Sequence, residues 1–126
     1  LVNHAYFNLA GQASGTILNQ MLCVEAGFYL PVDEHLIPTK EVRSVAGTAF
    51  DFRSARTIGH VLPAEGGFDH NLCLTAPPGP DGLRTCLRAT DPVSGRSLHL
   101  ATSEPGVQLY TGAHFDGSTG KAGARY

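Results

Sequence analysis

NHAYFNLAG, at residues 3–11, alternates polar and apolar side chains along its length. Successive side chains of an extended strand point to opposite faces, so the alternation predicts a half-buried β-strand. The polar face would carry His4, Tyr6 and Asn8, and the core face would carry Ala5, Phe7 and Leu9. One face of this predicted strand is therefore available for chemistry, while the other builds the core.

The rest of the chain predicts further short strands separated by turns. Extended segments are expected at residues 21–30, 47–53, 66–74, 83–90, 97–103 and 107–111. In the first, alternation places Leu22, Val24, Ala26, Phe28 and Leu30 on one face. Strands at this spacing are typical of a two-sheet sandwich. The sequence therefore predicts an all-β, antiparallel fold.

Prolines and glycines mark the connections between these strands. Pro31 and Pro38 favour a long ordered loop over residues 32–45, and the glycine-rich residues 112–123 also predict a loop. One short helix is expected at residues 54–62, with Ser54 as its N-cap and Pro63 just after its end. The double glycine at residues 66–67 predicts a close approach of backbone at the entrance of the following strand.

Composition excludes several classes of partner. The chain has 126 residues, which is at most one domain, and its net charge of −2 offers no basic surface to nucleic acid or an anionic membrane. No apolar run reaches the roughly 18 residues that span a bilayer, and no signal-peptide pattern opens the sequence. The three cysteines, with no close pair, indicate reduced thiols and a cytoplasmic location. A small neutral ligand fits this composition best.

Five blocks follow one another in a fixed order along the whole chain. They are NHAYFNLAG at residues 3–11, LPVDE and LIPT at 30–34 and 36–39, GTAFDFR at 47–53, GFDHN at 67–71 and PGVQLYTG at 105–112. In this order the blocks resemble the aldose 1-epimerase (galactose mutarotase) family in its vertebrate-like form. The resemblance implies a large antiparallel two-sheet β-sandwich, the supersandwich. Residues 1–126 would form one partial domain, a little over a third of a family member's length.

The resemblance also implies an activity and a set of site residues. Family members interconvert the α- and β-anomers of aldohexoses such as galactose and glucose by general acid/base ring opening, without metal or cofactor. His4 matches the family's proton donor, and Asp69 and Gln108 match positions that hold sugar hydroxyls. Tyr6 shares the face of His4 in the predicted strand and is expected to line the pocket. The full-length protein is expected to be a monomer.

The family's catalytic base is a glutamate on a strand that follows the glycine-rich loop. This position falls beyond Tyr126, and the family's N-terminal contribution to the pocket falls before residue 1. We therefore expect the chain to be an inactive fragment when isolated. Ala113-His114 also stands where the family usually has an Asn-Phe pair, which alters the rim of the loop.

Each candidate residue also has a structural interpretation when taken alone. His4 could be a structural strand histidine, Asp69 a turn carboxylate that accepts backbone N–H groups, and Gln108 a solvated strand residue. His70 and Cys73 are two possible zinc ligands without a second pair, which does not make a tetrahedral site.

Two alternatives to the epimerase remain open. A non-catalytic carbohydrate-binding β module would keep the sugar pocket without the chemistry. A hexose-phosphate mutarotase would need a basic cluster near the pocket, and the arginines at positions 43, 53, 56 and 84 are scattered in the sequence. In either case, the partner is a small sugar rather than nucleic acid or membrane.

Overall fold

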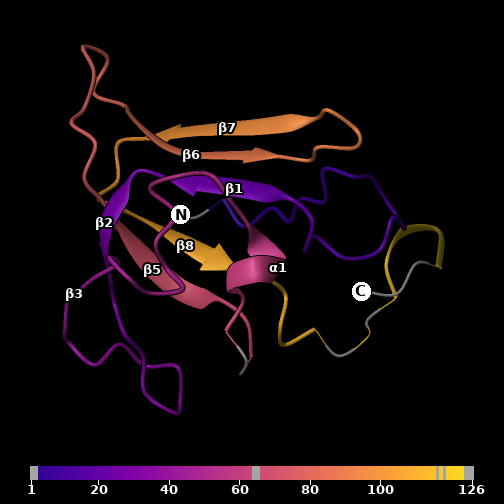
Figure 1. Ribbon diagram of the computed structural model, residues 1–126, viewed down its shortest axis with the longest axis horizontal. Helices are drawn as coiled ribbons and strands as arrows, with labels where there is room; N and C mark the ends of the chain where they lie inside the picture. The colour runs from indigo at the N-terminus through magenta and orange to yellow at the C-terminus, as the bar shows by residue number, and fades with distance from the viewer. Residues whose placement is uncertain (1–2, 64–65, 116, 118, 124–126) are drawn as a thin grey trace.

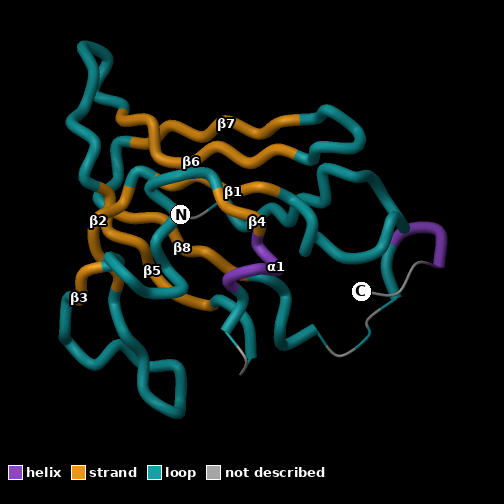
Figure 2. Tube along the Cα trace, viewed as in Figure 1, coloured by secondary structure: helices purple, strands orange, loops and turns teal. Residues whose placement is uncertain are grey.

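The computed structural model describes residues 3–63, 66–115, 117 and 119–123, and these form two four-stranded antiparallel sheets (Figure 1). Sheet A contains, in spatial order, β4 (Arg56–Thr57), β1 (Met21–Val24), β6 (Arg84–Thr90) and β7 (Ser97–Thr102). Sheet B contains β3 (Arg43–Ser44), β2 (Ala26–Tyr29), β5 (Asp69–Leu74) and β8 (Gly106–Tyr110). Figure 2 shows that loops connect most of these strands, and the helical segments described are α1 (Ile58–Val61) and η1 (Lys121–Gly123). The predicted all-β, two-sheet architecture is confirmed.

The hydrophobic core is built from both sheets and from the turns that join them. Its most deeply buried large side chains are Phe52, Phe68, Leu72, Val24, Val45 and Cys86. The rings of Phe52 and Phe68 meet edge to face, with centroids 5.4 Å apart. Full burial of such a side chain contributes about 1.5–3 kcal/mol, so this cluster is the main source of stability.

The opening segment, residues 3–8, is not a strand, and this prediction was wrong. Phe7, expected in the core, is 55% exposed. Alternation is a local pattern and supplies no partner, and no described strand pairs with these residues. The segment is fastened just after its end instead: Arg96 Nη1 donates to the carbonyl oxygens of Leu9 (2.9 Å) and Ala10 (3.1 Å). Ser94 Oγ also donates to Leu9 O at 2.8 Å, so the β6–β7 hairpin loop holds this end of the segment.

The single strand predicted at residues 21–30 is two strands, β1 and β2, which lie in different sheets. Glu25 separates them: its N–H donates to Cys86 O of β6 at 2.9 Å, and its carbonyl accepts the Thr75 N–H at 2.9 Å. The register of β2 then shifts between Ala26 and Phe28, which inserts Gly27 as a bulge. This shift reverses the expected faces, so that Tyr29 is buried whereas Phe28 is 44% exposed.

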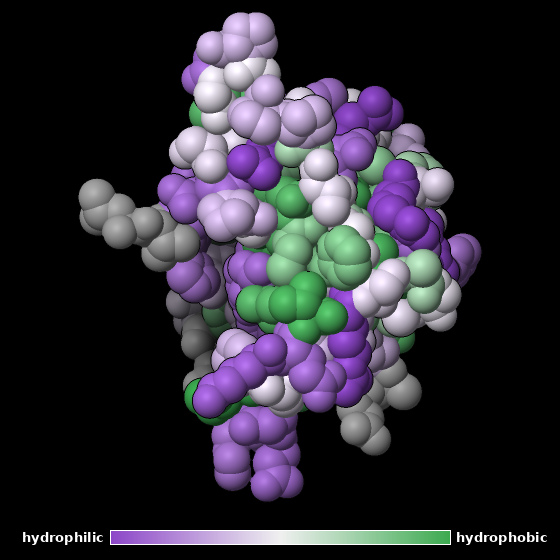
Figure 3. Space-filling model, turned by 90° about the vertical axis from the view of Figure 1, so that its left-hand side faces the viewer, coloured by the Kyte–Doolittle hydropathy of each residue, from purple (hydrophilic) through white to green (hydrophobic). Residues whose placement is uncertain are grey.

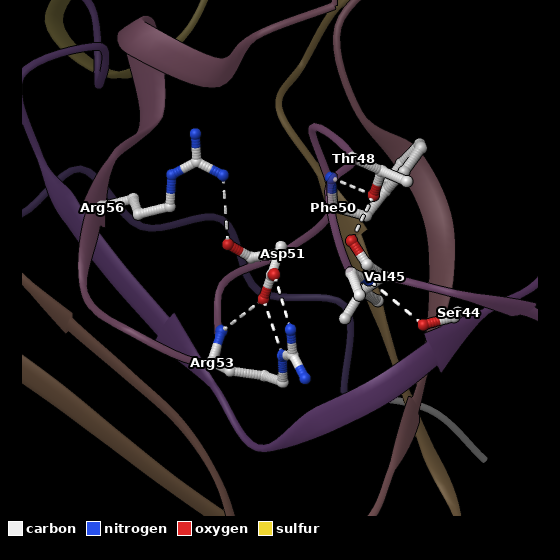
Figure 4. A network of polar contacts seen from close by, with 8 residues as sticks. Ser44, Val45, Thr48, Phe50, Asp51, Arg53 and Arg56 are labelled. Atoms are coloured by element: carbon white, nitrogen blue, oxygen red, sulfur yellow. Dashed lines mark hydrogen bonds and ion pairs between the residues drawn. The ribbon is translucent and has the colours of Figure 1, made fainter.

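Residues 47–53 form a turn rather than the expected extended segment. Thr48 Oγ1 donates to Val45 O at 2.7 Å and accepts the Phe50 N–H at 3.1 Å, which closes the turn locally (Figure 4). The Asp51 carboxylate then accepts two hydrogen bonds from the Arg53 guanidinium, at 2.8 and 2.7 Å. These bonds lower the pKa of Asp51 to about 2.

The predicted helix is shorter than expected and begins later. Arg56 and Thr57 pair with β1 as strand β4, so the helix cannot begin before Ile58. Its N-cap residue is therefore Thr57 and not Ser54.

The strands predicted in the second half of the chain are confirmed to within about three residues at their ends. However, β6 and β7 pair in sheet A, whereas β8 crosses to sheet B and pairs with β5. Residues 32–45 are mostly loop, as expected, with a bridge between Val32 and Pro38 and the short β3. Among the described residues, no helix has the length and apolar character needed to cross a bilayer.

Candidate functional site

The β5–β8 pair carries two of the predicted site residues on one face of sheet B. Asp69 lies opposite Tyr110, and Asn71 lies opposite Gln108. The alternate residues of β5, Leu72 and Leu74, are buried in the core. The outer face of this pair therefore presents Asp69, Asn71, Gln108 and Tyr110 together.

Asp69 and Gln108 are in direct contact. Gln108 Nε2 donates to Asp69 Oδ1 at 2.8 Å, a diagonal contact across the two strands. No other hydrogen bond to the Asp69 carboxylate is formed within the described parts of the chain. Its second oxygen and the Gln108 side-chain carbonyl are therefore available as acceptors for ligand hydroxyl groups. The structure therefore brings these two predicted site residues into contact, whereas their role in holding a sugar stays a prediction.

His4 and Tyr6 reach the same face through aromatic contacts. The ring centroids of His4 and Tyr6 are 5.1 Å apart. Tyr6 in turn meets Tyr110 edge to face at 6.1 Å and Phe115 at 5.0 Å. Tyr110 lies opposite Asp69, so these contacts bring all four predicted site residues to one side of sheet B.

Three aromatic residues that border Tyr6 or Tyr110, namely Tyr110, His114 and Phe115, were not among the site residues predicted from the sequence. Tyr110 shares the outer face with Gln108 because it lies two residues later in the same strand, and this spacing could have identified it. Its hydroxyl accepts the backbone N–H of His114 at 3.1 Å, and the two rings stack with centroids 6.2 Å apart. Strand spacing marks neither His114 nor Phe115, because their positions depend on how the loop after β8 folds.

The close backbone approach predicted at the double glycine occurs at Gly67. Gly67 has φ +74°, and a Cβ there would lie 2.5 Å from Thr111 Oγ1. The same hydroxyl accepts the Phe68 N–H at 2.9 Å, so a side chain at Gly67 would disturb the end of the β5–β8 pair. Gly66 has a similar φ of +72°, but nothing lies within 4 Å of its Cβ position.

His70 lies on the opposite face of β5, behind Asp69. Its ring packs against Phe50 and Tyr29, with centroids 4.6 and 6.2 Å apart. Burial lowers the pKa of His70 below its usual 6.5, against the opposing charge of Asp69. The imidazole is therefore neutral at pH 7.

Nothing in the described chain resembles a metal centre: no group of three or more His, Cys, Asp or Glu side chains could hold an ion there. Cys23, Cys73 and Cys86 are free. His70 and Cys73 also point to opposite faces of β5, because they lie three residues apart in one strand.

Two hollows of the surface lie away from the candidate site. One, of about 500 Å³, is lined by outer-face residues of sheet A, including Cys23, Arg88 and His99. Another, of about 330 Å³, is lined by Asp51, Arg53, Ser54 and Arg56. Figure 3 shows, on the side of β2 and β3, an apolar area framed by polar side chains. The candidate site residues line neither of these two hollows.

The chain is similar to known proteins both in sequence and in structure. A family model described as aldose 1-epimerase matches residues 1–125. Galactose mutarotases of Bos taurus and Homo sapiens are each 50% identical over 129 residues, which is 100% of this chain and 37% of theirs. A crystal structure of a GalM/aldose epimerase homologue from C. elegans superposes with a TM-score of 0.77 at 31% identity, over 91% of this chain and 35% of that one. The chain thus spans a little over a third of the length of the relatives it matches.

Proposed function

The chain belongs to the aldose 1-epimerase family, and on that premise we propose that it supplies the sugar-holding face and the acid of an enzyme that interconverts the α- and β-anomers of aldohexoses such as galactose and glucose. The observation that carries this proposal is the hydrogen-bonded pair of Asp69 and Gln108, on the same side of sheet B as His4 and Tyr6. The mammalian relatives named galactose mutarotase support the choice of substrate class.

In the proposed reaction His4 is the general acid. A base removes the proton from the hydroxyl group on C1 of the sugar while His4 donates a proton to the ring oxygen, and the bond between C1 and the ring oxygen breaks. Rotation of the resulting aldehyde and closure on its other face give the opposite anomer, with both proton transfers reversed. A histidine suits this task because its proton exchanges readily near neutral pH.

Asp69 and Gln108 hold the sugar in this proposal. Their free acceptor atoms bind hydroxyl groups, and the rings of Tyr6 and Tyr110 border the sugar beside them. The proposal assigns the base to none of residues 1–126, which correspond to 37% of the length of the Bos taurus relative. The ligand is a neutral sugar, and we place the protein in the cytoplasm, where its three free thiols stay reduced.

A non-catalytic sugar-binding module is the second candidate. It is favoured by the fact that strand register holds Asp69 and Gln108, whereas His4 lies on a segment without strand pairing. A hexose-phosphate substrate has less support. Arg53 and Arg56 do line one hollow, but Arg53 is paired with Asp51 at 2.7 Å, and no candidate site residue lines that hollow.

A chimera tests the proposal. Residues 1–126 replace the corresponding 129-residue stretch of the Bos taurus galactose mutarotase, which supplies the flanking chain. Polarimetry then follows the approach of fresh α-D-galactose to anomeric equilibrium. We expect the chimera to accelerate this approach, and His4→Ala to slow it by about 10²–10⁴-fold, the usual contribution of one proton-transfer group.

The matched control is His99→Ala, because His99 lies on β7 of the other sheet. It should leave the rate unchanged. A chimera that binds galactose but leaves the rate at the buffer value would favour the binding module. A His4→Ala chimera as fast as its parent would remove His4 from the chemistry.

A further inference from the structure

Within the described residues, no backbone carbonyl of a neighbouring strand accepts the N–H of Asp69, although Asp69 lies at the start of β5. Thr111 N–H donates to Phe68 O at 3.0 Å and Leu74 N–H donates to Pro105 O at 2.9 Å, which fixes the hydrogen-bonded pairs of the β5–β8 ladder. Such pairs alternate along an antiparallel ladder, so the N–H of Asp69 points away from β8 and towards β2. On that side the last bond is from Leu30 N–H to Asn71 O at 3.0 Å, and Pro31 follows. The Asp69 N–H therefore lies just beyond the end of β2.

The side chain of His70 accepts the hydrogen bond that the backbone of a neighbouring strand would otherwise accept. The Asp69 N–H donates to His70 Nδ1 at 3.3 Å. The imidazole is held from two other elements: by Phe50, whose ring is tilted against it at 4.6 Å, and by Tyr29 of β2, whose ring lies edge-on at 6.2 Å. Packing thus fixes the position of His70 Nδ1, which contacts the backbone N–H of Asp69. The carboxylate of the same Asp69 accepts the hydrogen bond from Gln108.

We propose that His70 is a positioning residue for sugar binding: its neutral imidazole accepts the Asp69 N–H through Nδ1 and thereby fixes the Asp69 carboxylate on the outer face of sheet B. The sugar-binding part of this inference rests on the proposed function, whereas the hydrogen bond does not. His70 touches no ligand, because it lies on the core side of the strand. It acts through the backbone of Asp69.

The proposal requires one tautomer and one charge state of His70. Nδ1 can accept a hydrogen bond only when the ring proton is on Nε2, and protonation of Nδ1 would put two donors face to face. The ring is surrounded by Tyr29, Phe50, Asp69 and, opposite it in β8, Leu109. Of these, Asp69 and Tyr29 carry ionisable side chains. Burial keeps the ring neutral to below pH 6.5, despite the attraction of the Asp69 carboxylate. The contact should therefore be intact at neutral pH and lost on acidification.

NMR spectroscopy on the full chain tests the hydrogen bond without any sugar. We expect the ¹⁵N shifts of His70 to show an unprotonated Nδ1 at pH 7, and the Asp69 amide to shift on acidification with the midpoint of His70, below pH 6.5. His99, on β7 of the other sheet, supplies the control, and the His99→Ala variant should leave the response of the Asp69 amide to acidification unchanged. A protonated Nδ1 at pH 7, or an Asp69 amide that ignores the titration of His70, would overturn the proposal.

Two substitutions in the chimera then test the effect on the site. His70→Phe keeps an aromatic ring against Phe50 but removes the acceptor, and we expect galactose to bind about 2–10-fold more weakly at pH 7, the effect of one net hydrogen bond. His70→Asn offers an amide oxygen that does not titrate. It should restore binding to within about 2-fold and abolish the loss of affinity that we expect of the parent as the pH falls through the pKa of His70.

The outcomes separate this inference from the proposed function. If galactose does not bind the parent chimera, the proposed function fails, and the NMR titration still decides whether His70 holds Asp69. If galactose binds and His70→Phe binds it as tightly as the parent, the positioning role fails while the proposed function stands. If the parent and His70→Asn lose affinity equally on acidification, another group is responsible and the positioning role also fails.

Discussion

The β5–β8 pair places Asp69 and Gln108 by backbone register, whereas the opening segment, residues 3–8, brings His4 and Tyr6 to the same face without strand pairing. The pair rests on Leu72 and Phe68, which are both fully buried. The opening segment is held by the rings that Tyr6 meets and, at its other end, by Asn8 and the β6–β7 loop. The groups that would hold the sugar therefore lie on strands anchored in the core, whereas the group that would donate the proton lies on a segment attached to the surface. Substitutions in the two regions should separate stability from activity.

The largest effect is expected in the core beneath the pair. Leu72→Ala removes a completely buried side chain from the centre of β5 and should lower the free energy of unfolding by about 2–5 kcal/mol. Phe7→Ala in the opening segment removes a larger side chain that is already 55% exposed, and should cost less than about 1 kcal/mol. Urea denaturation measures both, and equal losses would break the comparison.

The entrance of β5 offers a matched pair of glycines. Gly67→Ala should cost about 2–4 kcal/mol, because it combines an unfavourable backbone conformation with a Cβ only 2.5 Å from Thr111 Oγ1. Gly66→Ala has nearly the same positive φ in open space and should cost about 1–2 kcal/mol. Thermal or urea unfolding measures both losses of stability. The difference between them is the cost of the steric clash with Thr111. A Gly67→Ala loss no greater than that of Gly66→Ala would show that the strand entrance is not closely packed.

Asn8 ends the opening segment and fixes it to the body of the fold. Its side chain donates to Gly15 O at 2.9 Å and accepts from Gln20 Nε2 at 2.9 Å, and Gln20 is buried. Asn8→Ala leaves the Gln20 amide without this partner and should cost about 1–3 kcal/mol. In the chimera it should slow mutarotation more than it weakens galactose binding, because it displaces His4 and not Asp69.

Asn3→Ala is the control for Asn8. Asn3 is exposed and accepts only the Ala5 N–H at 3.1 Å within the described residues, so the stability should change by less than about 0.5 kcal/mol. If Asn8→Ala were as mild as Asn3→Ala, the opening segment would be held by its aromatic contacts.

The smallest effect should appear on acidification, at the hairpin loop that holds Leu9. The Ser94 N–H donates to Asp91 Oδ1 at 2.6 Å, and this bond is the main reason that the pKa of Asp91 is lowered. A carboxylate with a lowered folded-state pKa stabilises the fold above its unfolded value near 3.9, and this contribution is lost as the pH falls through the folded value. Asp91→Asn should therefore show a smaller loss of melting temperature between pH 5 and pH 2 than the parent. An unchanged loss would mean that other carboxylates govern the acid response.

Local patterns predicted most of the second half of the fold because the strands there lie between clear turns and bury alternate residues. They failed at residues 3–8 because alternation cannot show whether a partner strand exists. They also failed at residues 21–30, where no sequence signal shows that one continuous apolar pattern is shared between two sheets. Asp69 and Gln108 were predicted as site residues from their blocks, whereas the contact between them joins positions 39 residues apart in the sequence and depends on strand pairing. The role of His70 depends on where β2 ends, which only the structure reveals.

Glu25 divides its two backbone groups between the sheets, since its N–H bonds to β6 of sheet A and its carbonyl bonds to Thr75, just after β5 of sheet B. Neither sheet can open at this point without breaking a bond that orders the other. In native-state hydrogen exchange, the central amides of β1, β5 and β6 should therefore exchange in one cooperative unit, with a common free energy of opening. The amides of residues 3–8 should exchange separately and earlier. His4, the proposed proton donor, would then detach from sheet B and return to it while both sheets stay folded.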